Sequence, residues 1–231
     1  MTYAIPLPPV HSLAIAGRVE RFPVYRIFCV GRNYEAHARE MGKDPSREPP
    51  FFFMKPAAAA VDAAKPVTIP YPPKTSNFHH EVELVVAIGK HCANATVASA
   101  LECVFGYAVG LDMTRRDLQL EARDKGRPWE FGKSFAGSAP IGPLHAVAAV
   151  GHPASAAIQL DVNGARKQSS DISKLIWSVA ECIAHLTAYE ALQPGDLIMT
   201  GTPEGVGPVV RGDVMVAAIT GLDPISVIVG N

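Results

Sequence analysis

The chain has 231 residues, 48% of them hydrophobic, so it can bury a full core and has the length of one β-rich domain. Its 21 lysines and arginines nearly balance 22 aspartates and glutamates, which excludes the basic surface expected of a protein that binds nucleic acid or anionic membranes. Its longest apolar runs are far shorter than the roughly 20 residues of a membrane-spanning helix.

Residues 1–25 are rich in proline and predict an N-terminal arm with one short strand. No basic segment followed by an apolar one is found there, so we expect no secretory signal and a cytoplasmic protein. The cysteines lack the C-x-x-C spacing, and in a reducing compartment each is expected to behave as a small buried side chain. They are Cys29, Cys92, Cys103 and Cys182.

A buried strand is predicted at 27–30, and a short helix should follow it from 34 to 41. Asn33 stands at the expected N-cap and Gly42 at the expected C-terminal glycine. His37 and Glu40 are three residues apart on this helix and therefore share one face. The residues that follow are polar and rich in proline, so we interpret the segment 41–50 as a candidate lid.

The middle of the chain predicts four further strands and one helix before a long polar segment. The strands are expected at 51–56, 67–70, 79–88 and 104–111, and the helix at 95–103. The segment 114–134 is charged, is interrupted by glycine, and is too long for a hairpin turn. Because it directly follows Asp112, we interpret it as a functional segment.

The last third of the chain is predicted to be β-rich with one helix. Strands are expected near 156–162, 197–200, 214–218 and 225–229, and the helix at 173–191. Asn163-Gly164 is typical of a hairpin turn. The glycine-rich stretch 201–208 lacks the G-x-G-x-x-G order and contains prolines that prevent a following helix, which argues against a dinucleotide site.

Glu81 and Glu83 form the centre of the candidate site, because alternate side chains of a strand point to the same face. Two like charges at this spacing repel each other unless a cation lies between them, and Asp112 can supply a third oxygen ligand. Three carboxylates without a thiolate favour Mg²⁺, Mn²⁺ or Ca²⁺ over zinc. An isolated Glu-x-Glu is more simply a solvated acidic face, but the polar segment after Asp112 favours the metal site. His79 shares the face and is expected beside the ligands.

Five segments, taken together in this order, resemble the fumarylacetoacetate hydrolase family. They are Gly31-Arg32-Asn33-Tyr34 with His37 and Glu40; Phe53-Met54-Lys55-Pro56; Glu81-Val82-Glu83-Leu84; Gly110-Leu111-Asp112 with Arg116, Gln119 and Lys133; and Thr200-Gly201-Thr202-Pro203. The resemblance implies an α+β, β-rich fold whose mixed sheets roll into a barrel-like core. It also implies Mg²⁺ (or Mn²⁺) bound by Glu81, Glu83 and Asp112, a homodimer, and cleavage of a carbon–carbon bond in a 1,3-diketo acid.

Within the family the chain is similar to the short acylpyruvate hydrolases, so residues 1–231 are expected to form a single catalytic domain. The stretch 47–53 and the start of the chain are similar to members that cleave fumarylpyruvate to fumarate and pyruvate in gentisate breakdown. Close relatives hydrolyse maleylpyruvate or acetylpyruvate, or decarboxylate oxaloacetate, and these alternatives stay open. A metal-binding β-barrel module without enzymatic activity is a further alternative.

The resemblance and the chemistry together suggest roles for individual residues. His37, held by Glu40, fits the base that activates water, and Lys133 and Gln119 are expected at the reacting carbonyl. Substrate binding is assigned to Arg116, Thr202, Arg32 and Arg47, with Arg47 expected to meet a distal carboxylate. The simpler alternatives are an exposed ion pair on the helix, a solvated polar face, a tight turn at Thr202 and a solvent-exposed Arg47.

Overall fold

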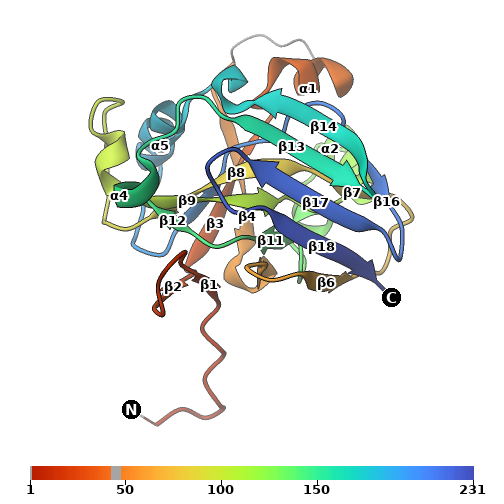
Figure 1. Cartoon of the computed structure of the whole chain (residues 1–231), viewed down its shortest axis with the longest axis horizontal. Helices are drawn as coiled ribbons and strands as arrows, with labels where there is room; N and C mark the ends of the chain where they lie inside the picture. Colours follow the sequence, from red (N-terminus) through yellow and green to blue (C-terminus); the bar gives the residue numbers. More distant parts are fainter. Residues whose placement is uncertain (1, 43–47) are drawn as a thin grey trace.

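The computed structural model describes residues 2–42 and 48–231. A five-stranded sheet crosses the front of the view in Figure 1, and a larger sheet curls behind it. The helices are short and lie around the ends and edges of the sheets. This arrangement confirms the β-rich, mixed-sheet architecture with a barrel-like core.

The larger sheet provides the strands that position the candidate site. Its order is β4-β3-β15-β8-β9-β11-β5, with β12 paired to β9. These strands span Phe51–Pro56 (β4), Arg26–Gly31 (β3), Leu197–Met199 (β15), Val82–Ile88 (β8), Val104–Leu111 (β9), Ala139–Ile141 (β11), Ala60–Asp62 (β5) and His145–Ala146 (β12). Strand β15 is parallel to β3 and antiparallel to β8, so distant parts of the chain meet in the middle of the sheet.

Strand β8 runs through the core, and all seven of its residues are buried. Leu84 and Val86 belong to the main hydrophobic cluster between the two large sheets, whereas Val85 and Ala87 belong to a second cluster on the other face. A nearly continuous apolar run of this kind is typical of a strand covered on both faces. Because Glu83 alternates with Val82 and Leu84, it shares the face of Val85 and is buried with it.

The second sheet covers the main core from the other side. Its order is β14-β13-β17-β18-β6, spanning Ala165–Asp171 (β14), Ala157–Val162 (β13), Val214–Ile219 (β17), Ile225–Gly230 (β18) and Val67–Pro70 (β6). The hairpin predicted at Asn163-Gly164 joins β13 to β14. Asn163 and Gly164 have φ angles of 51° and 78°, and positive values at both positions are what a type I′ turn requires.

Two small sheets and several short helices complete the described part of the chain. The small sheets are β1 (Ser12–Ala14) with β2 (Arg21–Pro23), and β10 (Thr114–Arg115) with β7 (Phe78–His80) and β16 (Gly207–Val209). The α-helices are α1 (Glu35–Glu40), α2 (Arg116–Asp124), α3 (Glu130–Lys133), α4 (Val147–Val150) and α5 (Val179–Thr187). The 3-10 turns are η1 (Ala57–Ala59), η2 (Ala100–Cys103) and η3 (Ile172–Lys174). No described helix has the length and apolar character needed to cross a bilayer.

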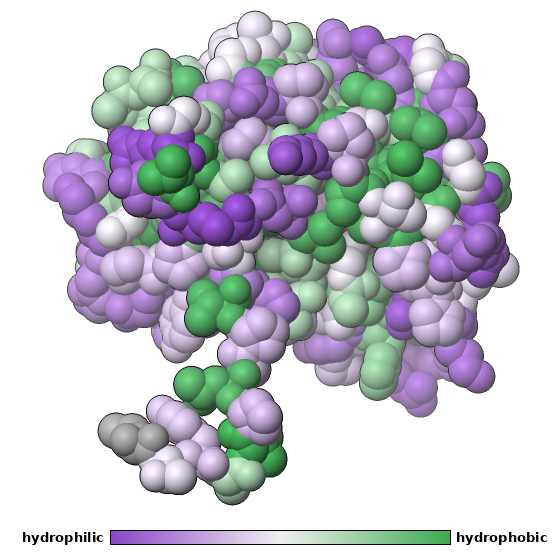
Figure 2. Space-filling model, turned by 60° about the horizontal axis from the view of Figure 1, so that its bottom comes forward, coloured by the Kyte–Doolittle hydropathy of each residue, from purple (hydrophilic) through white to green (hydrophobic). Residues whose placement is uncertain are grey.

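The N-terminal arm leaves the body of the protein before β1 (Figure 1). Residues 2–11 contain no helix or strand, and two short strands, not one, follow them. The side chains of Tyr3, Ile5, Leu7 and Val10 are exposed, and Figure 2 shows apolar groups along the projecting segment. The arm therefore presents apolar surface that stays largely exposed in the described part of the chain.

The strand predicted at 79–88 is in fact two strands that meet at Glu81. Strand β7 ends at His80 and pairs with β10 and β16, whereas β8 begins at Val82 and pairs with β9 and β15. The chain thus changes sheets at Glu81. Alternation within one segment cannot reveal such a change, because it depends on partner strands that are distant in sequence.

Two of the helix predictions need correction, and the helices of one polar segment were not predicted. The segment 95–103 forms only the 3-10 turn η2, and 173–191 contains η3 and the shorter α5. Helix α5 starts later because Ser178 and Glu181 form a capping box there. The polar segment 114–134, for which no helix was predicted, contains α2 and α3.

Asn33 does not cap α1, whose N-cap is Tyr34 without a side-chain bond. Instead, Asn33 is buried and donates from Nδ2 to the carbonyl oxygens of Trp177 and Thr200, at 2.9 and 2.8 Å. Its Oδ1 accepts a bond of 2.7 Å from the Trp177 amide. Asn33 therefore ties the end of β3 to the end of β15 and to the segment before α5.

We expect Asn33→Ala to lower the free energy of unfolding by about 3 kcal/mol, because it removes three hydrogen bonds from buried and part-buried backbone groups. Urea unfolding of the metal-free protein measures this change. A loss below about 1 kcal/mol, the usual effect of a surface substitution, would contradict the role of Asn33 as a tie between these segments.

Candidate active site and metal centre

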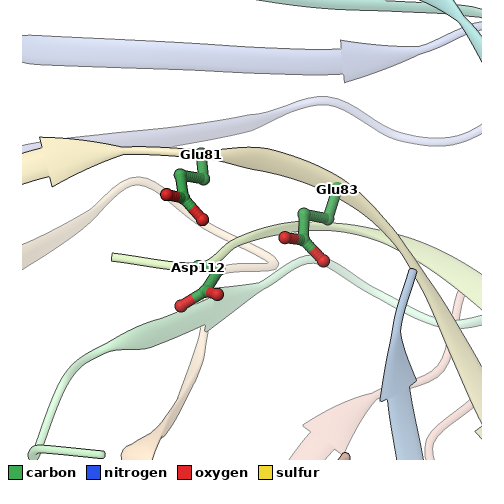
Figure 3. Close-up of side chains that lie close together, drawn as sticks. All are labelled: Glu81, Glu83 and Asp112. Carbon is green, nitrogen blue, oxygen red and sulfur yellow. The ribbon is translucent and has the colours of Figure 1, made fainter. Parts of the chain in front are cut away.

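The carboxylates of Glu81, Glu83 and Asp112 point toward one another at the ends of β8 and β9 (Figure 3). One oxygen from each residue lies within 4.8 Å of the others, and the residues are 4%, 2% and 1% exposed. The amide of Asp112 donates to the carbonyl of Glu81 at 2.8 Å, which fixes the two backbones beside each other. The structure thus brings together all three predicted metal ligands.

Three cationic side chains surround this triad. Lys133 Nζ donates to Glu81 Oε2 and to Asp112 Oδ2, each at 2.7 Å. Arg116 Nη2 donates to the second oxygen of Glu81. Lys55, which is fully buried, places its Nζ 2.8 Å from Asp112 Oδ1 and 3.0 Å from Ser138 Oγ. Glu81 and Asp112 are therefore held by ion pairs.

Glu83 differs from the other two members of the triad. Its Oε2 accepts a bond of 2.7 Å from the Gly201 amide, and no lysine or arginine in the described part of the chain forms an ion pair with it. Burial, together with Asp112 and Glu81, raises the pKa of Glu83 well above its usual value. Burial also acts to raise the pKa of Glu81, but Lys133 and Arg116 outweigh it and hold that pKa well below normal.

These observations fit a divalent cation with a preference for oxygen ligands. Three buried carboxylates without nitrogen or sulfur donors suit Mg²⁺ or Mn²⁺. Asp112 Oδ1 is buried without a hydrogen-bond donor among the described residues, although Lys55 lies close to it. A cation at this position would satisfy that oxygen and balance the charge of Glu83, so the residues present fit the ion.

His37 and Glu40 form the predicted pair on α1 and lie near the triad. His37 Nδ1 is 3.2 Å from Glu40 Oε2, and the Gly205 amide donates to Glu40 Oε1 at 3.1 Å. Burial acts to raise the pKa of Glu40, but the bonds from His37 and Gly205 hold it below its usual value. His37 lines the same pocket as the triad. A carboxylate at Nδ1 favours the tautomer whose Nε2 is free to accept a proton.

Arg116 and Gln119 lie on the buried face of α2. Arg116 Nη1 donates to Gln119 Oε1 at 2.7 Å, which leaves the Gln119 amide nitrogen to act as a donor. Arg116 Nε also lies 3.5 Å from His79 Nδ1, and His79 Nε2 is 2.8 Å from Asn77 Oδ1. Burial and Arg116 lower the pKa of His79 to about 4, so it is neutral at pH 7. His79 lies beside the ligands and outside the triad.

The remaining predicted residues are placed as follows. Thr202 is buried, lines the pocket, and accepts a bond of 2.8 Å from Gln168 Nε2. Arg32 also lines the pocket, with its guanidinium 5.3 Å from the centre of the Phe51 ring. Arg47, and with it the part of the candidate lid from 43 to 47, lies outside the described residues.

Two residues that position the site were not predicted as site residues. Lys55 is the single charge in the strand 51–56, which is otherwise made of apolar residues and a proline, and this isolated charge was a signal for a role in the site. Gln168 lies on β14 and contacts both neighbours of Glu81: its Oε1 is 3.1 Å from His80 Nδ1 and from the Val82 amide. No local pattern marks Gln168, because all of these partners, including Thr202, are more than 30 residues away in sequence.

Aromatic side chains form another part of the pocket. Trp129, which precedes α3, packs against Phe51 and Phe53 with ring centroids 5.4 and 5.7 Å apart. Lys133 Nζ lies 5.2 Å from the centre of the Phe53 ring. Trp129 and Phe53 line the pocket together with the charged residues, so the triad faces an apolar surface on one side.

Comparison with known proteins gives three consistent findings. Residues 26–229 match the family model described as fumarylacetoacetate (FAA) hydrolase C-terminal. The chain is 52% identical over 190 residues to a fumarylpyruvate hydrolase of Ralstonia sp., covering 81% of this chain and 96% of the relative. It is 41% identical over 196 residues to the mitochondrial oxaloacetate tautomerase of Homo sapiens, covering 85% of this chain and 87% of that protein.

A solved structure is similar over almost the full length. The crystal structure of fumarylpyruvate hydrolase from Pseudomonas aeruginosa in complex with Mn²⁺ and pyruvate has a TM-score of 0.95 and 55% sequence identity. The match covers 99% of each chain. The fold therefore has a counterpart in a protein whose structure was solved with Mn²⁺ and pyruvate.

Proposed function

Because this chain belongs to the fumarylacetoacetate hydrolase family, we propose that it is a metal-dependent enzyme that hydrolyses a carbon–carbon bond of an acylpyruvate. Its substrate is fumarylpyruvate, and its products are fumarate and pyruvate. The observation that carries the proposal is a buried triad of carboxylates that shares one pocket with His37, whose other neighbour is Glu40. Hydrolysis of a 1,3-diketo acid needs both parts, a site that binds its oxygens and a base that activates water. The 52% identity to a fumarylpyruvate hydrolase supports this choice of substrate.

Glu81, Glu83 and Asp112 would hold Mg²⁺ or Mn²⁺, which when bound orients the substrate oxygens and stabilises the negative charge of the departing pyruvate enolate. Lys133 and Arg116 keep Glu81 ionised and fix its two oxygens in place. Lys55 and Lys133 form ion pairs with the two oxygens of Asp112 and hold them in place. Lys133 thus orients two ligands and also lines the pocket.

His37 removes a proton from the attacking water, and Glu40 stabilises the imidazolium that forms. Water attacks the carbonyl carbon farther from the pyruvate carboxylate, and the bond between that carbon and its neighbour on the pyruvate side then breaks. The proton held by His37 is transferred to the carbon that leaves, which completes pyruvate. Gln119, whose oxygen is bound by Arg116, has its amide N–H group available for the negative charge that develops on the attacked carbonyl.

A second candidate reaction is proton transfer at the carbon next to the ketone of oxaloacetate. It requires the same triad and base but no attacking water. The 41% identity to a mitochondrial oxaloacetate tautomerase favours this candidate over other rivals. Decarboxylation of oxaloacetate would depend on the triad and would not need the His37–Glu40 pair.

One side-by-side assay tests the proposed function. The Mn²⁺-loaded protein is given fumarylpyruvate, maleylpyruvate, acetylpyruvate and oxaloacetate, and both product formation and tautomer exchange are followed. We expect kcat/KM to be highest for hydrolysis of fumarylpyruvate. Tautomer exchange or decarboxylation of oxaloacetate without hydrolysis of any acylpyruvate would refute the proposal.

We further propose that the chain works as one catalytic domain in a cytoplasmic homodimer that takes part in gentisate breakdown. All four cysteines are buried free thiols, which suits a reducing compartment. The exposed apolar groups of the N-terminal arm, and Phe131 on α3 at 82% exposure, support contact with a second copy. Light scattering at micromolar concentration checks the oligomeric state, and a monomer there would contradict the dimer.

A further inference from the structure

Helix α2 places three polar side chains along one face of the pocket. Arg116, Gln119 and Arg123 are spaced by three and four residues, so they lie on the same side of the helix, and all three line the pocket. Arg116 and Gln119 are 3% and 6% exposed, whereas 29% of the Arg123 side chain is exposed. The row of side chains therefore runs outward from the triad, with Arg123 about 10 Å along the helix from Arg116.

The metal centre does not use the charge of Arg123. Arg116, Lys55 and Lys133 each contact a carboxylate of the triad. The acidic partner of Arg123 is the adjacent Asp124, which lies 2.9 Å from Nε and 2.8 Å from Nη2 and whose side chain is 64% exposed. Nη1 has no acceptor among the described residues. Because a guanidinium has five N–H donors in one plane, Arg123 is able to bind a second carboxylate.

Arg32 offers a second such group on another part of the pocket wall. It follows β3 and lines the pocket, and its guanidinium lies over the ring of Phe51. No carboxylate in residues 2–42 or 48–231 forms an ion pair with it. Its φ angle of 56° lies in the left-handed region, which is uncommon for a residue other than glycine and is concentrated at functional sites.

We propose that Arg123, together with Arg32, binds the distal carboxylate of a dicarboxylic acylpyruvate, an assignment that rests on the proposed function. Such a substrate carries a carboxylate at each end of its chain. The triad and its metal bind the end that becomes pyruvate, so the other carboxylate lies farther out. Among the cations of the described pocket lining, Arg123 and Arg32 are those without a bond to the triad. An acylpyruvate with a methyl tail has no group for them to bind.

The first test compares Arg123→Gln with the native enzyme on fumarylpyruvate and acetylpyruvate. We expect kcat/KM for fumarylpyruvate to fall about tenfold to 100-fold, mainly through KM, because tenfold corresponds to about 1.4 kcal/mol and the lost bond joins two charged groups. The value for acetylpyruvate should change less than about twofold. Arg127→Gln is the matched control, since Arg127 is exposed on the same segment and does not line this pocket. Arg32→Gln should show the same selectivity as Arg123→Gln.

Calorimetry of product binding gives a readout that is independent of turnover. In Arg123→Gln the affinity for fumarate should fall about tenfold or more, while the affinity for pyruvate at the metal end stays near that of the native protein. Equal losses for fumarylpyruvate and acetylpyruvate, or unchanged fumarate binding, would overturn the assignment and leave the proposed function intact. If the native enzyme hydrolyses neither acylpyruvate, the proposed function fails, and this assignment fails with it.

Discussion

Replacing Glu83 by glutamine is expected to lower the affinity for Mn²⁺ by at least about 100-fold and to remove most of the hydrolase activity, while leaving the metal-free protein as stable as before or more stable. Loss of an outer partner of a metal ligand already costs up to about 100-fold, and Glu83 is itself a ligand candidate. Its buried carboxyl group faces two other carboxylates without an ion pair in the described chain, and its raised pKa shows that the charged form is disfavoured there. The glutamine oxygen preserves the bond from the Gly201 amide, and a neutral amide avoids the cost of charging or protonating a buried carboxyl group at neutral pH.

Asp112→Ala is the informative comparison with Glu83→Gln. It should also lose metal affinity, but the free energy of unfolding of the metal-free protein should fall strongly. It leaves buried Lys55 without its carboxylate partner in the described chain and buried Lys133 with Glu81 alone, and breaking a buried pair costs about 3–5 kcal/mol. Calorimetry with Mn²⁺ and urea unfolding in chelator measure the two effects. Glu121→Gln, at an exposed position of α2, is the control. Native metal affinity in Glu83→Gln, Glu81→Ala and Asp112→Ala would rule out the triad as the metal site.

Replacing His37 by alanine should lower kcat for hydrolysis by about 10²–10⁴-fold, the range for a lost general base, while Mn²⁺ affinity remains near native. Among the described residues, His37 forms no hydrogen bond or ion pair with Glu81, Glu83 or Asp112, so its removal leaves the ion pairs of the triad in place. Glu40→Gln should also lower kcat, because it removes the charge that stabilises the imidazolium. Stopped assays of hydrolysis and calorimetry of the metal-loaded proteins measure these quantities.

The same short helix supplies the controls. Arg39 and Glu35 form an ion pair, and the side chain of each is 60% exposed. The variants Arg39→Ala and Glu35→Gln should therefore hydrolyse the substrate at nearly the native rate. Native hydrolysis in His37→Ala would show that another group activates water. If oxaloacetate decarboxylation survives in His37→Ala while hydrolysis is lost, the two reactions use the triad in common and only hydrolysis uses the base.

The sequence alone was sufficient for most of the strands, because their signal is local. β3, β4 and β9 match the expected segments closely, since apolar runs bounded by glycine, proline or a charge identify buried strands. Convergence of Glu81, Glu83 and Asp112 could also be expected, since alternation along one segment and the end of the next strand fix these positions. The Asn163-Gly164 turn is recognised by residues that tolerate positive φ.

What sequence reasoning missed depends on contacts between distant segments. Asparagine is a common helix N-cap, but the side chain of Asn33 donates hydrogen bonds to Trp177 and Thr200 instead of capping α1. The residues 114–134 looked too polar for a packed element, yet α2 buries Arg116 and Gln119 against the triad. In the sequence, a charged helix residue that is buried against a strand looks the same as one that faces solvent, because the strand is distant in sequence. The same holds for Lys55 on β4, whose partner Asp112 is distant in sequence.

The insertion of β15 between β3 and β8 has a consequence for how the protein is made. The bond from the Gly201 amide to Glu83 joins residues 118 positions apart, and the bonds of Arg26 to Asp196 and of Asn33 to Thr200 span 170 and 167 positions. Contacts of such separation form late, because a long loop of chain must close first. On the ribosome, all three carboxylates of the triad emerge well before the strand that completes their surroundings. The nascent chain therefore has no finished site for the ion, and metal capture marks the end of folding. Mn²⁺ should accordingly slow unfolding of the native protein and leave its refolding rate unchanged.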